Sequence, residues 1–256
     1  MKKFLLLLLV TLFLASCGSM IKNTSEFKYN WQEVPMDSTW NEIKDSSATQ
    51  VIAKYKYQIA PLTEIIGYST NELRKKEPES PLSNFAVDVI REAAIQYCMC
   101  DVDLALTNFG GIRSEMPKGA VRVYDIFSIF PFNNYIVIAD IKGKELKKIF
   151  DQMAKSGQVE ALSNVEIVID GYKLKKAYVG GRPIDDNKVY KLATINFLLE
   201  GGDGLRVKKY SESITETNIF IRDAIVEHIK KLTAAGKKIN PKSDGRVIVK
   251  NSKREQ

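Results

Sequence analysis

The stretch Asn196-Phe197-Leu198-Leu199-Glu200-Gly201-Gly202-Asp203-Gly204 follows a run of residues, Tyr190 to Ile195, that is typical of a buried β-strand. Three glycines around an aspartate indicate a tight turn, because glycine adopts backbone conformations that other residues avoid. Glycine at such a corner also lets a flat ligand come close to the backbone. The stretch therefore predicts a strand that ends beside a ligand, with the aromatic side chain of Phe197 at that end of the strand.

A second corner has a similar composition. Asn108-Phe109-Gly110-Gly111-Ile112-Arg113 follows another strand-like run, Asp103 to Thr107. Like the first corner, it places an aromatic or polar side chain beside glycines at the exit of a strand. We expect both corners to contact the same kind of ligand.

The rest of the chain predicts an α+β domain with a mixed sheet, because strands and helices alternate irregularly. Gly180-Gly181-Arg182-Pro183 indicates a hairpin turn, and Gly157 and Gly236 mark the ends of two helices. Further strands are predicted at 66–68, 120–124, 135–141 and 165–169. Helices are predicted from Val51 to about Ile66 with an interruption at Pro61, at 81–97, around Leu146 to Met153 and at 217–235.

The N-terminus indicates export. Residues 1–16 combine a lysine pair with an apolar run too short for a comfortable permanent membrane span. The apolar run, Phe4 to Leu14, leads into Leu14-Ala15-Ser16-Cys17, which resembles the lipobox of bacterial lipoproteins, in which the cysteine carries lipid. We expect a lipid anchor in the bacterial cell envelope, a tether and lead-in over 17–47, and a folded domain over 48–256. The alternative is an ordinary secretory signal in which Cys17 is incidental.

Composition argues against two classes of function. Removing the lysine pair with the signal lowers the formal charge from +7 by 2 to +5, and the remaining basic residues are scattered among acids. Nucleic-acid binding is therefore not indicated. The chain has one histidine, His228, so it does not carry the histidine-rich ligand set of a two-metal hydrolase. Cys98 and Cys100, with one residue between them, are expected to be structural thiols, since this spacing is awkward for a disulfide.

Five motifs occur in the order found in the C-terminal domain of 5'-nucleotidases, which this chain resembles from about Ala48 to Val249. Their agreement in order is more specific than any one of them. The motifs are Pro81-Leu82-Ser83-Asn84, Asn108 to Arg113, Pro131-Phe132-Asn133-Asn134, Gly143-Lys144-Glu145-Leu146 and Phe197 to Gly204.

The resemblance implies a domain that holds the nucleoside part of a nucleotide. Phe132 and Phe197 match two aromatic residues that clamp the base between their faces. Asp203 matches the acidic residue that accepts hydrogen bonds from the ribose hydroxyls, and Arg113 matches an arginine directed at the anionic and sugar part. Asn108, with Gly110 and Gly111, matches the corner that approaches the substrate.

Two further matches concern the borders of this site. Where the family commonly has another substrate-directed arginine, this chain has Lys76, which would hold an anion as a point charge. Asp244-Gly245-Arg246 resembles the closing turn of the family and is expected to be structural. Taken singly, the residues of the site also fit ordinary turn or core positions. Their joint occurrence in the positions of the family favours binding.

In this family a separate N-terminal metallophosphatase domain carries two divalent metal ions and cleaves the phosphate ester. We predict no such domain within this sequence and expect the isolated chain not to hydrolyse nucleotides. Our leading hypothesis is the nucleotide-binding part of a 5'-nucleotidase, completed by a separately encoded metallophosphatase that carries the metals. The alternatives are a stand-alone lipoprotein that binds nucleotides or nucleotide sugars without chemistry, and a structural lipoprotein with a degenerate pocket.

Overall fold

The computed structural model describes residues 46–251, without the side chains of residues 46–49 and 58. The chain divides into two units, Met1–Ile52 and Ala53–Gln256, and the description below concerns the second. Only the beginning of helix α2 (Ser46–Ile59) belongs to the described part of the first. The signal sequence, Cys17 and the lead-in up to residue 45 lie outside the described residues.

The strands are β1 (Ile65–Ser69), β2 (Leu104–Thr107), β3 (Gly119–Arg122), β4 (Tyr135–Lys142), β5 (Ala161–Ser163), β6 (Val165–Asp170), β7 (Lys173–Val179), β8 (Arg182–Pro183), β9 (Val189–Ile195), β10 (Ser211–Phe220) and β11 (Val247–Lys250). The helices after α2 are α3 (Pro81–Cys98), α4 (Val123–Ile129), α5 (Gly143–Ser156), α6 (Asn196–Leu199), α7 (Val207–Tyr210) and α8 (Ile221–Ala234), with short 3-10 turns η2 (Ala60–Thr63), η3 (Phe109–Gly111) and η4 (Gly202–Gly204).

The central sheet has the strand order β10-β4-β9-β2-β5. β2 and β9 run parallel, whereas the other neighbouring pairs in this sheet are antiparallel. All four residues of β2 are buried, and most of those in β4 and β9 are too, so both faces of the sheet are covered. The predicted α+β domain with a mixed sheet is confirmed.

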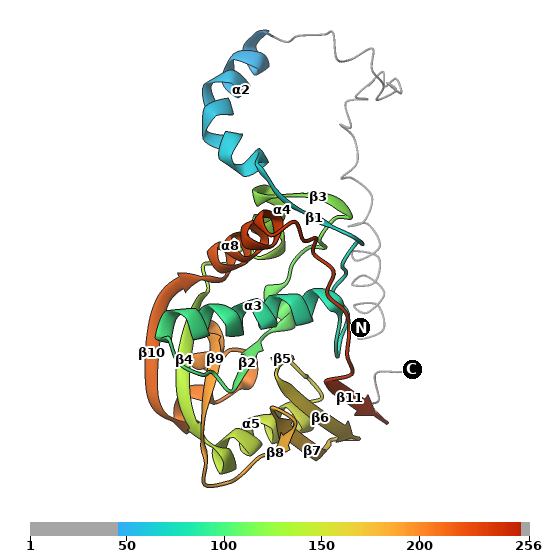
Figure 1. The fold of residues 1–256 in the computed structure, drawn as a ribbon, viewed down its shortest axis with the longest axis vertical. Coiled ribbons are helices and arrows are strands. Elements are labelled where there is room, and N and C mark those ends of the chain that lie inside the picture. Colours follow the sequence, from blue (N-terminus) through green and yellow to red (C-terminus); the bar gives the residue numbers. More distant parts are fainter. Residues whose placement is uncertain (1–45, 252–256) are drawn as a thin grey trace, which may run out of the picture. The chain divides into compact units, whose positions relative to one another are not determined.

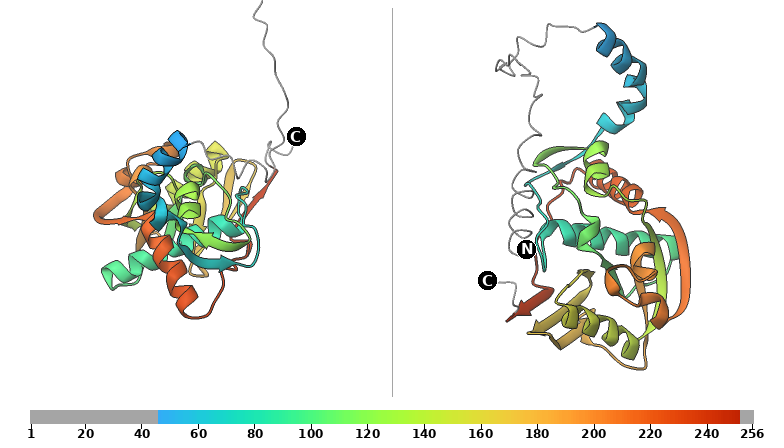
Figure 2. Two further views of the ribbon diagram at one scale, coloured as in Figure 1. Left: turned by 90° about the horizontal axis from the view of Figure 1, so that it is seen from above. Right: turned by 180° about the vertical axis from the view of Figure 1, so that it is seen from behind.

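Helices and two smaller sheets complete the domain (Figures 1 and 2). α3 lies across the central sheet and contacts β2, β4, β5 and β9, while α8 packs against α3 and β1. α5 contacts β4 and β9 and also β7, so it joins the central sheet to a second sheet of order β11-β6-β7-β8. β1 pairs with β3 in a third sheet of two strands.

Local sequence explains where the longest helices begin and end. Ser80 is the N-cap of α3: its side chain accepts from the backbone N–H of Ser83, and the Ser83 hydroxyl accepts from the backbone N–H of Ser80. α5 ends at Gly157 as predicted, in the left-handed conformation (φ 68°) that favours glycine. The Gly180-Gly181 turn joins β7 to β8, as the hairpin prediction required.

The last predicted helix begins later than expected. We placed its start near Thr217, but β10 continues to Phe220 and α8 begins at Ile221. Pairing with β4 holds this segment extended, since the Thr217 hydroxyl donates to the carbonyl oxygen of Ile136 in that strand. Asn218 adopts a φ of 59°, which a right-handed helix does not contain. The predicted strand 120–124 is also shorter, because α4 begins at Val123.

The prediction for Cys98 and Cys100 is wrong, because the structure joins them in a disulfide. Met99, the residue between them, ends α3 in the left-handed conformation with a φ of 50°. This turn brings the Cα atoms of the two cysteines to 5.1 Å, which is within the usual range for a bridge. Spacing alone did not reveal the turn.

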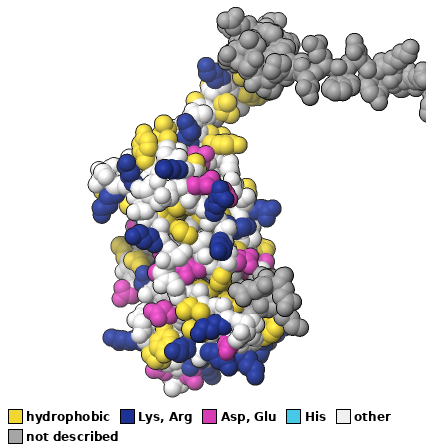
Figure 3. All heavy atoms as spheres, turned by 90° about the vertical axis from the view of Figure 1, so that its right-hand side faces the viewer, with side chains coloured by type: hydrophobic (Ala, Val, Ile, Leu, Met, Phe, Trp, Pro, Cys, Tyr) yellow, Lys and Arg dark blue, Asp and Glu magenta, His cyan; other side chains and the backbone are white. Residues whose placement is uncertain are grey.

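The surface carries mixed charges. On the face shown in Figure 3, Lys and Arg side chains are interspersed with acidic, apolar and uncharged ones, as in the sequence. Across residues 46–251, we find no helix with the length and apolar character needed to cross a membrane.

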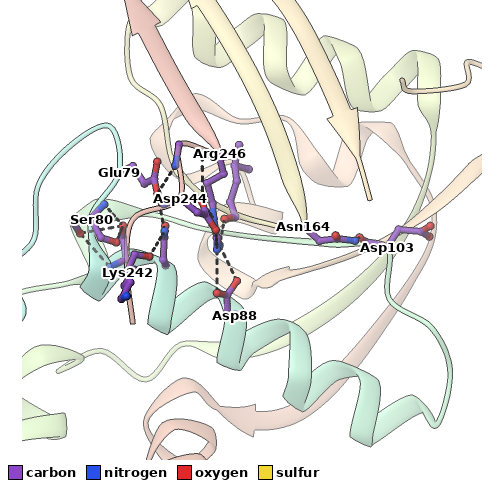
Figure 4. Close-up of polar contacts among 12 residues, drawn as sticks. Glu79, Ser80, Asp88, Asp103, Asn164, Lys242, Asp244 and Arg246 are labelled. Carbon is purple, nitrogen blue, oxygen red and sulfur yellow. Dashed lines mark hydrogen bonds and ion pairs between the residues drawn. The ribbon is translucent and has the colours of Figure 1, made fainter. Parts of the chain in front are cut away.

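Arg246 fastens the segment before β11 to the body of the domain (Figure 4). Its guanidinium donates to Asp88 on α3 (Nη1–Oδ1 2.8 Å), to Asp244 (Nη2–Oδ2 2.7 Å) and to the carbonyl oxygen of Leu162 (2.9 Å). Burial disfavours the charged guanidinium, but the two carboxylates outweigh this effect and raise the pKa of Arg246. The turn Asp244 to Arg246 thus makes the structural contacts expected from the resemblance.

We expect Arg246→Ala to lower the free energy of unfolding by about 2 kcal/mol. Breaking a buried ion pair costs more, but both carboxylates here are half exposed and can regain water. Urea unfolding followed by circular dichroism measures the change, with the exposed Arg182→Ala as the matched control. Equal unfolding midpoints for the two variants would contradict the role of Arg246.

Candidate functional site

The strand order brings three chain segments to one edge of the central sheet. β2 and β9 are parallel neighbours, so the corners that follow them, which begin at Asn108 and Asn196, leave the sheet at the same edge. β4 runs antiparallel to β9, with Ile136 opposite Ile195, so the segment that precedes β4 lies at this edge too. The carboxyl ends of parallel strands are a common place for ligand sites in such sheets.

A cavity of about 220 Å³ lies between these three segments. Both glycine corners and the segment before β4 contribute to its wall. The lining residues are Asn108, Gly110, Gly111, Phe132, Asn134, Phe197 and Asp203. Six of these are residues that the sequence suggested for ligand binding, and the cavity brings them together although Asn108 and Asp203 are 95 positions apart in the chain. Asn134 was not singled out, although it belongs to one of the five motifs.

A hydrogen bond between side chains connects the two glycine corners. Asn108 Nδ2 donates to Asp203 Oδ2 at 2.8 Å. Asp203 holds a left-handed conformation (φ 52°), and the nearby Gly201 and Gly204 also have positive φ. The amide nitrogen must face the carboxylate, so Asn108 Oδ1 points elsewhere. This oxygen is buried and has no partner among the described residues.

The two aromatic residues of the cavity are exposed rather than part of the core. Phe132 is 49% exposed and Phe197 is 42% exposed, although large apolar side chains are usually covered. A Cβ atom on Gly202 would overlap the ring of Phe197, so the ring rests directly against the backbone of η4. The absence of a side chain at position 202 therefore sets the place of this ring in the cavity wall.

Of the two predicted cationic residues, Arg113 lies beside the cavity residue Phe132. The Arg113 guanidinium is 6.0 Å from the centre of the Phe132 ring, and Nη1 donates to the carbonyl oxygen of Gly110 at 3.4 Å. Lys76 is exposed, and the lysine that reaches the corner is its neighbour Lys75. Lys75 Nζ donates to the carbonyl oxygens of Ile112 (2.9 Å) and Phe109 (3.4 Å).

Sequence reasoning missed Glu160, which lies directly before β5 and behind the first corner. Its side chain is buried, and Oε2 accepts the backbone N–H of Phe109 at 2.8 Å. Burial raises the pKa of Glu160 from its ordinary 4.5 to about 7, against the effect of that hydrogen bond. Since the folded-state pKa is the higher one, Glu160 contributes stability at low pH that is lost as the pH rises from about 4.5 through about 7.

His228 lies on α8 and contacts α3. Its Nδ1 lies 2.9 Å from Glu92 Oε2 on α3, and its ring packs edge-on against Phe85. Within residues 46–251, no three histidine, cysteine or acidic side chains are grouped in a way that would hold a metal ion.

Comparison with known proteins gives the family. The model of the 5'-nucleotidase C-terminal domain matches residues 40–210, which is more than half of the chain. The chain belongs to this family. The match includes both glycine corners, the segment before β4 and Glu160.

Relatives of known sequence agree with the family. Protein UshA of Yersinia enterocolitica is 32% identical over 142 residues, which are 54% of this chain and 26% of UshA. The trifunctional nucleotide phosphoesterase protein YfkN of Bacillus subtilis is 25% identical over 86% of this chain and 16% of its own length. The matched part of the chain therefore spans about a quarter of UshA and a smaller share of YfkN.

Solved structures show the same fold. The 5'-nucleotidase precursor of Thermus thermophilus superposes with a TM-score of 0.70 at 24% identity, over 81% of this chain and 44% of its own. The NAD nucleotidase of Haemophilus influenzae gives a TM-score of 0.63 at 20% identity, over 90% of this chain and 47% of its own.

We expect Gly202→Ala to lower the free energy of unfolding by about 1 kcal/mol, because the new methyl group displaces the Phe197 ring. The same substitution made together with Phe197→Ala should cost less, since the ring is no longer there. Urea unfolding of the two single variants and the double variant measures this coupling. An equal cost of Gly202→Ala with and without the ring would show that the two residues do not pack together.

Proposed function

We propose that this chain binds the nucleoside part of a nucleotide and serves as the nucleotide-binding part of a 5'-nucleotidase-type hydrolase in nucleotide catabolism. The observation that carries the proposal is the cavity, which is lined by two exposed aromatic residues together with the carboxylate residue Asp203 and the amide residue Asn108. Such a mixture suits a ligand with a flat aromatic part and a hydroxylated part.

The aromatic residues supply the affinity for the base. Phe132 and Phe197 come from different segments, and both expose ring surface at the cavity. Stacking of a base on a protein ring is worth roughly 1–3 kcal/mol and depends little on which base is present. A site built on two phenylalanines should therefore accept both purines and pyrimidines.

The polar residues suit the sugar and the phosphate. Asp203 has a carboxylate oxygen beyond the one bonded to Asn108, and a carboxylate offers only acceptors to the O–H donors of ribose. Asn108 holds this carboxylate in place through its amide nitrogen. Arg113, beside Phe132, offers a planar set of donors to a phosphate, and Lys76 is the second cation in our proposal.

Hydrolysis requires groups that the described residues do not offer. Metal-dependent cleavage of a phosphate ester uses two divalent ions to activate water and to neutralise the transferred group. Residues 46–251 contain no cluster suited to such ions, and the whole sequence has one histidine. We propose that a separately encoded metallophosphatase carries these metals and completes the active site.

The expected location follows from the N-terminus. We propose that Cys17 carries the lipid anchor and that the domain is held at a membrane of the bacterial envelope. The two halves of the enzyme would then meet in the envelope, where the substrate arrives from outside the cell.

We expect Phe197→Ala and Phe132→Ala each to weaken the binding of AMP and adenosine about tenfold, because each removes one stacking surface. Titration calorimetry measures the affinities, and Phe127→Ala is the matched control: Phe127 is also exposed, but its ring packs against Arg222 and does not line the cavity. Wild-type protein that binds neither ligand would refute the function, and equal losses in all three variants would refute the assignment of the rings.

We expect the purified chain to release no phosphate from AMP in the presence of Mn²⁺ or Zn²⁺. Addition of a metallophosphatase captured from the envelope of the same cells should restore release, and Phe197→Ala should reduce it. Phosphate release by the chain alone would contradict the division of labour. Nucleotide binding without any phosphatase partner would instead favour the stand-alone binding protein.

A further inference from the structure

Glu160 is placed where it controls the shape of the first glycine corner. β2 and β5 are antiparallel, with Thr107 opposite Ala161, so the pairing brings Glu160 next to Asn108 at the end of both strands. The carboxylate accepts a hydrogen bond from the backbone N–H of Phe109. Phe109 lies in the chain between Asn108 and the two glycines that line the cavity. A single side chain thus fixes the peptide plane from which the ligand groups on both sides extend.

Among the described residues, no basic side chain forms an ion pair with the carboxylate of Glu160. Its Oε1 accepts from the neutral amide of Gln158 at 3.2 Å, and the charges that act on it most are the acidic groups of Asp203 on η4 and Glu77 before α3. Lys75 supports the same corner from its carbonyl side, through Phe109 and Ile112. A buried carboxylate near other acidic groups is costly to keep charged. The hydrogen bond to the backbone N–H of Phe109 is the contact that offsets part of this cost.

We propose that Glu160 is a positioning residue of the nucleotide site, and that the charge on its carboxylate makes the affinity for the nucleoside depend on pH. This inference rests on the proposed function. A charged carboxylate holds an N–H about twice as strongly as a neutral acceptor does. The corner is therefore held more firmly when Glu160 is ionised, and Asn108 keeps its orientation toward Asp203. Because burial moves the pKa of Glu160 to about 7, this change falls within the physiological range.

Adenosine is the probe for the test, because it has no group that titrates between about pH 6 and about pH 8 and so reports only on the protein. Wild-type affinity measured by titration calorimetry should rise about fivefold across this range, as expected from a hydrogen bond that strengthens by about 1 kcal/mol. Glu160→Gln keeps an acceptor for Phe109 without the charge, so its affinity should be independent of pH and close to the wild-type value at low pH. Glu160→Leu leaves the backbone N–H of Phe109 without this acceptor, so this variant should bind adenosine more weakly than the wild type at both about pH 6 and about pH 8. Glu166→Gln, an exposed position on β6, is the matched control and should retain the wild-type profile.

A second measurement does not depend on the ligand. The protection factor of the Phe109 amide in hydrogen exchange should increase with pH in the wild type and should not change in Glu160→Gln. A wild-type affinity that is flat with pH, or a profile that Glu160→Gln shares with the wild type, overturns the inference. Absence of adenosine binding at every pH overturns the proposed function, and the exchange of Phe109 then still decides whether Glu160 holds the corner.

Discussion

The hydrogen bond from Asn108 to Asp203 is the contact on which the candidate site depends. It joins two corners that are far apart in the chain, and it fixes the orientation of both side chains at once. The amide nitrogen holds one carboxylate oxygen of Asp203, so the other carboxylate oxygen is left as an acceptor at the cavity. An arrangement that offers only acceptors suits a ligand with neighbouring hydroxyl groups.

The central sheet makes this contact possible, and residues behind the cavity keep it in place. Parallel pairing of β2 with β9 sends both corners out at one edge, and antiparallel pairing of β4 with β9 adds the segment that carries Phe132. Asn196 strengthens this junction, because its Oδ1 accepts the backbone N–H of Tyr135 at the start of β4. Gly202 lets the Phe197 ring rest on the backbone, and Glu160 holds the first corner. The strand order thus forms the cavity, and only a few side chains in its wall are available to contact a ligand.

The sequence was informative where a residue type has one physical use. Gly157 ends α5, and Gly201 and Gly204 shape the corner after β9, because few other residues adopt a positive φ. It was silent where the role depends on residues distant in the chain. Glu160 looks like an ordinary surface acid until β5 pairs with β2, and β10 is too polar to suggest a strand until it pairs with β4. The Cys98–Cys100 disulfide depends on the turn at Met99, which no neighbouring residue type demands.

The most direct test of this account is a double-mutant cycle on adenosine affinity with Asn108→Ala, Asp203→Ala and the combined variant. If the two side chains act as one unit at the ligand, each single substitution removes most of the effect and the double variant loses little more, which gives a coupling energy of about 1–3 kcal/mol. Additive losses, with a coupling energy near zero, would show that the two corners act on the ligand independently and would contradict the account.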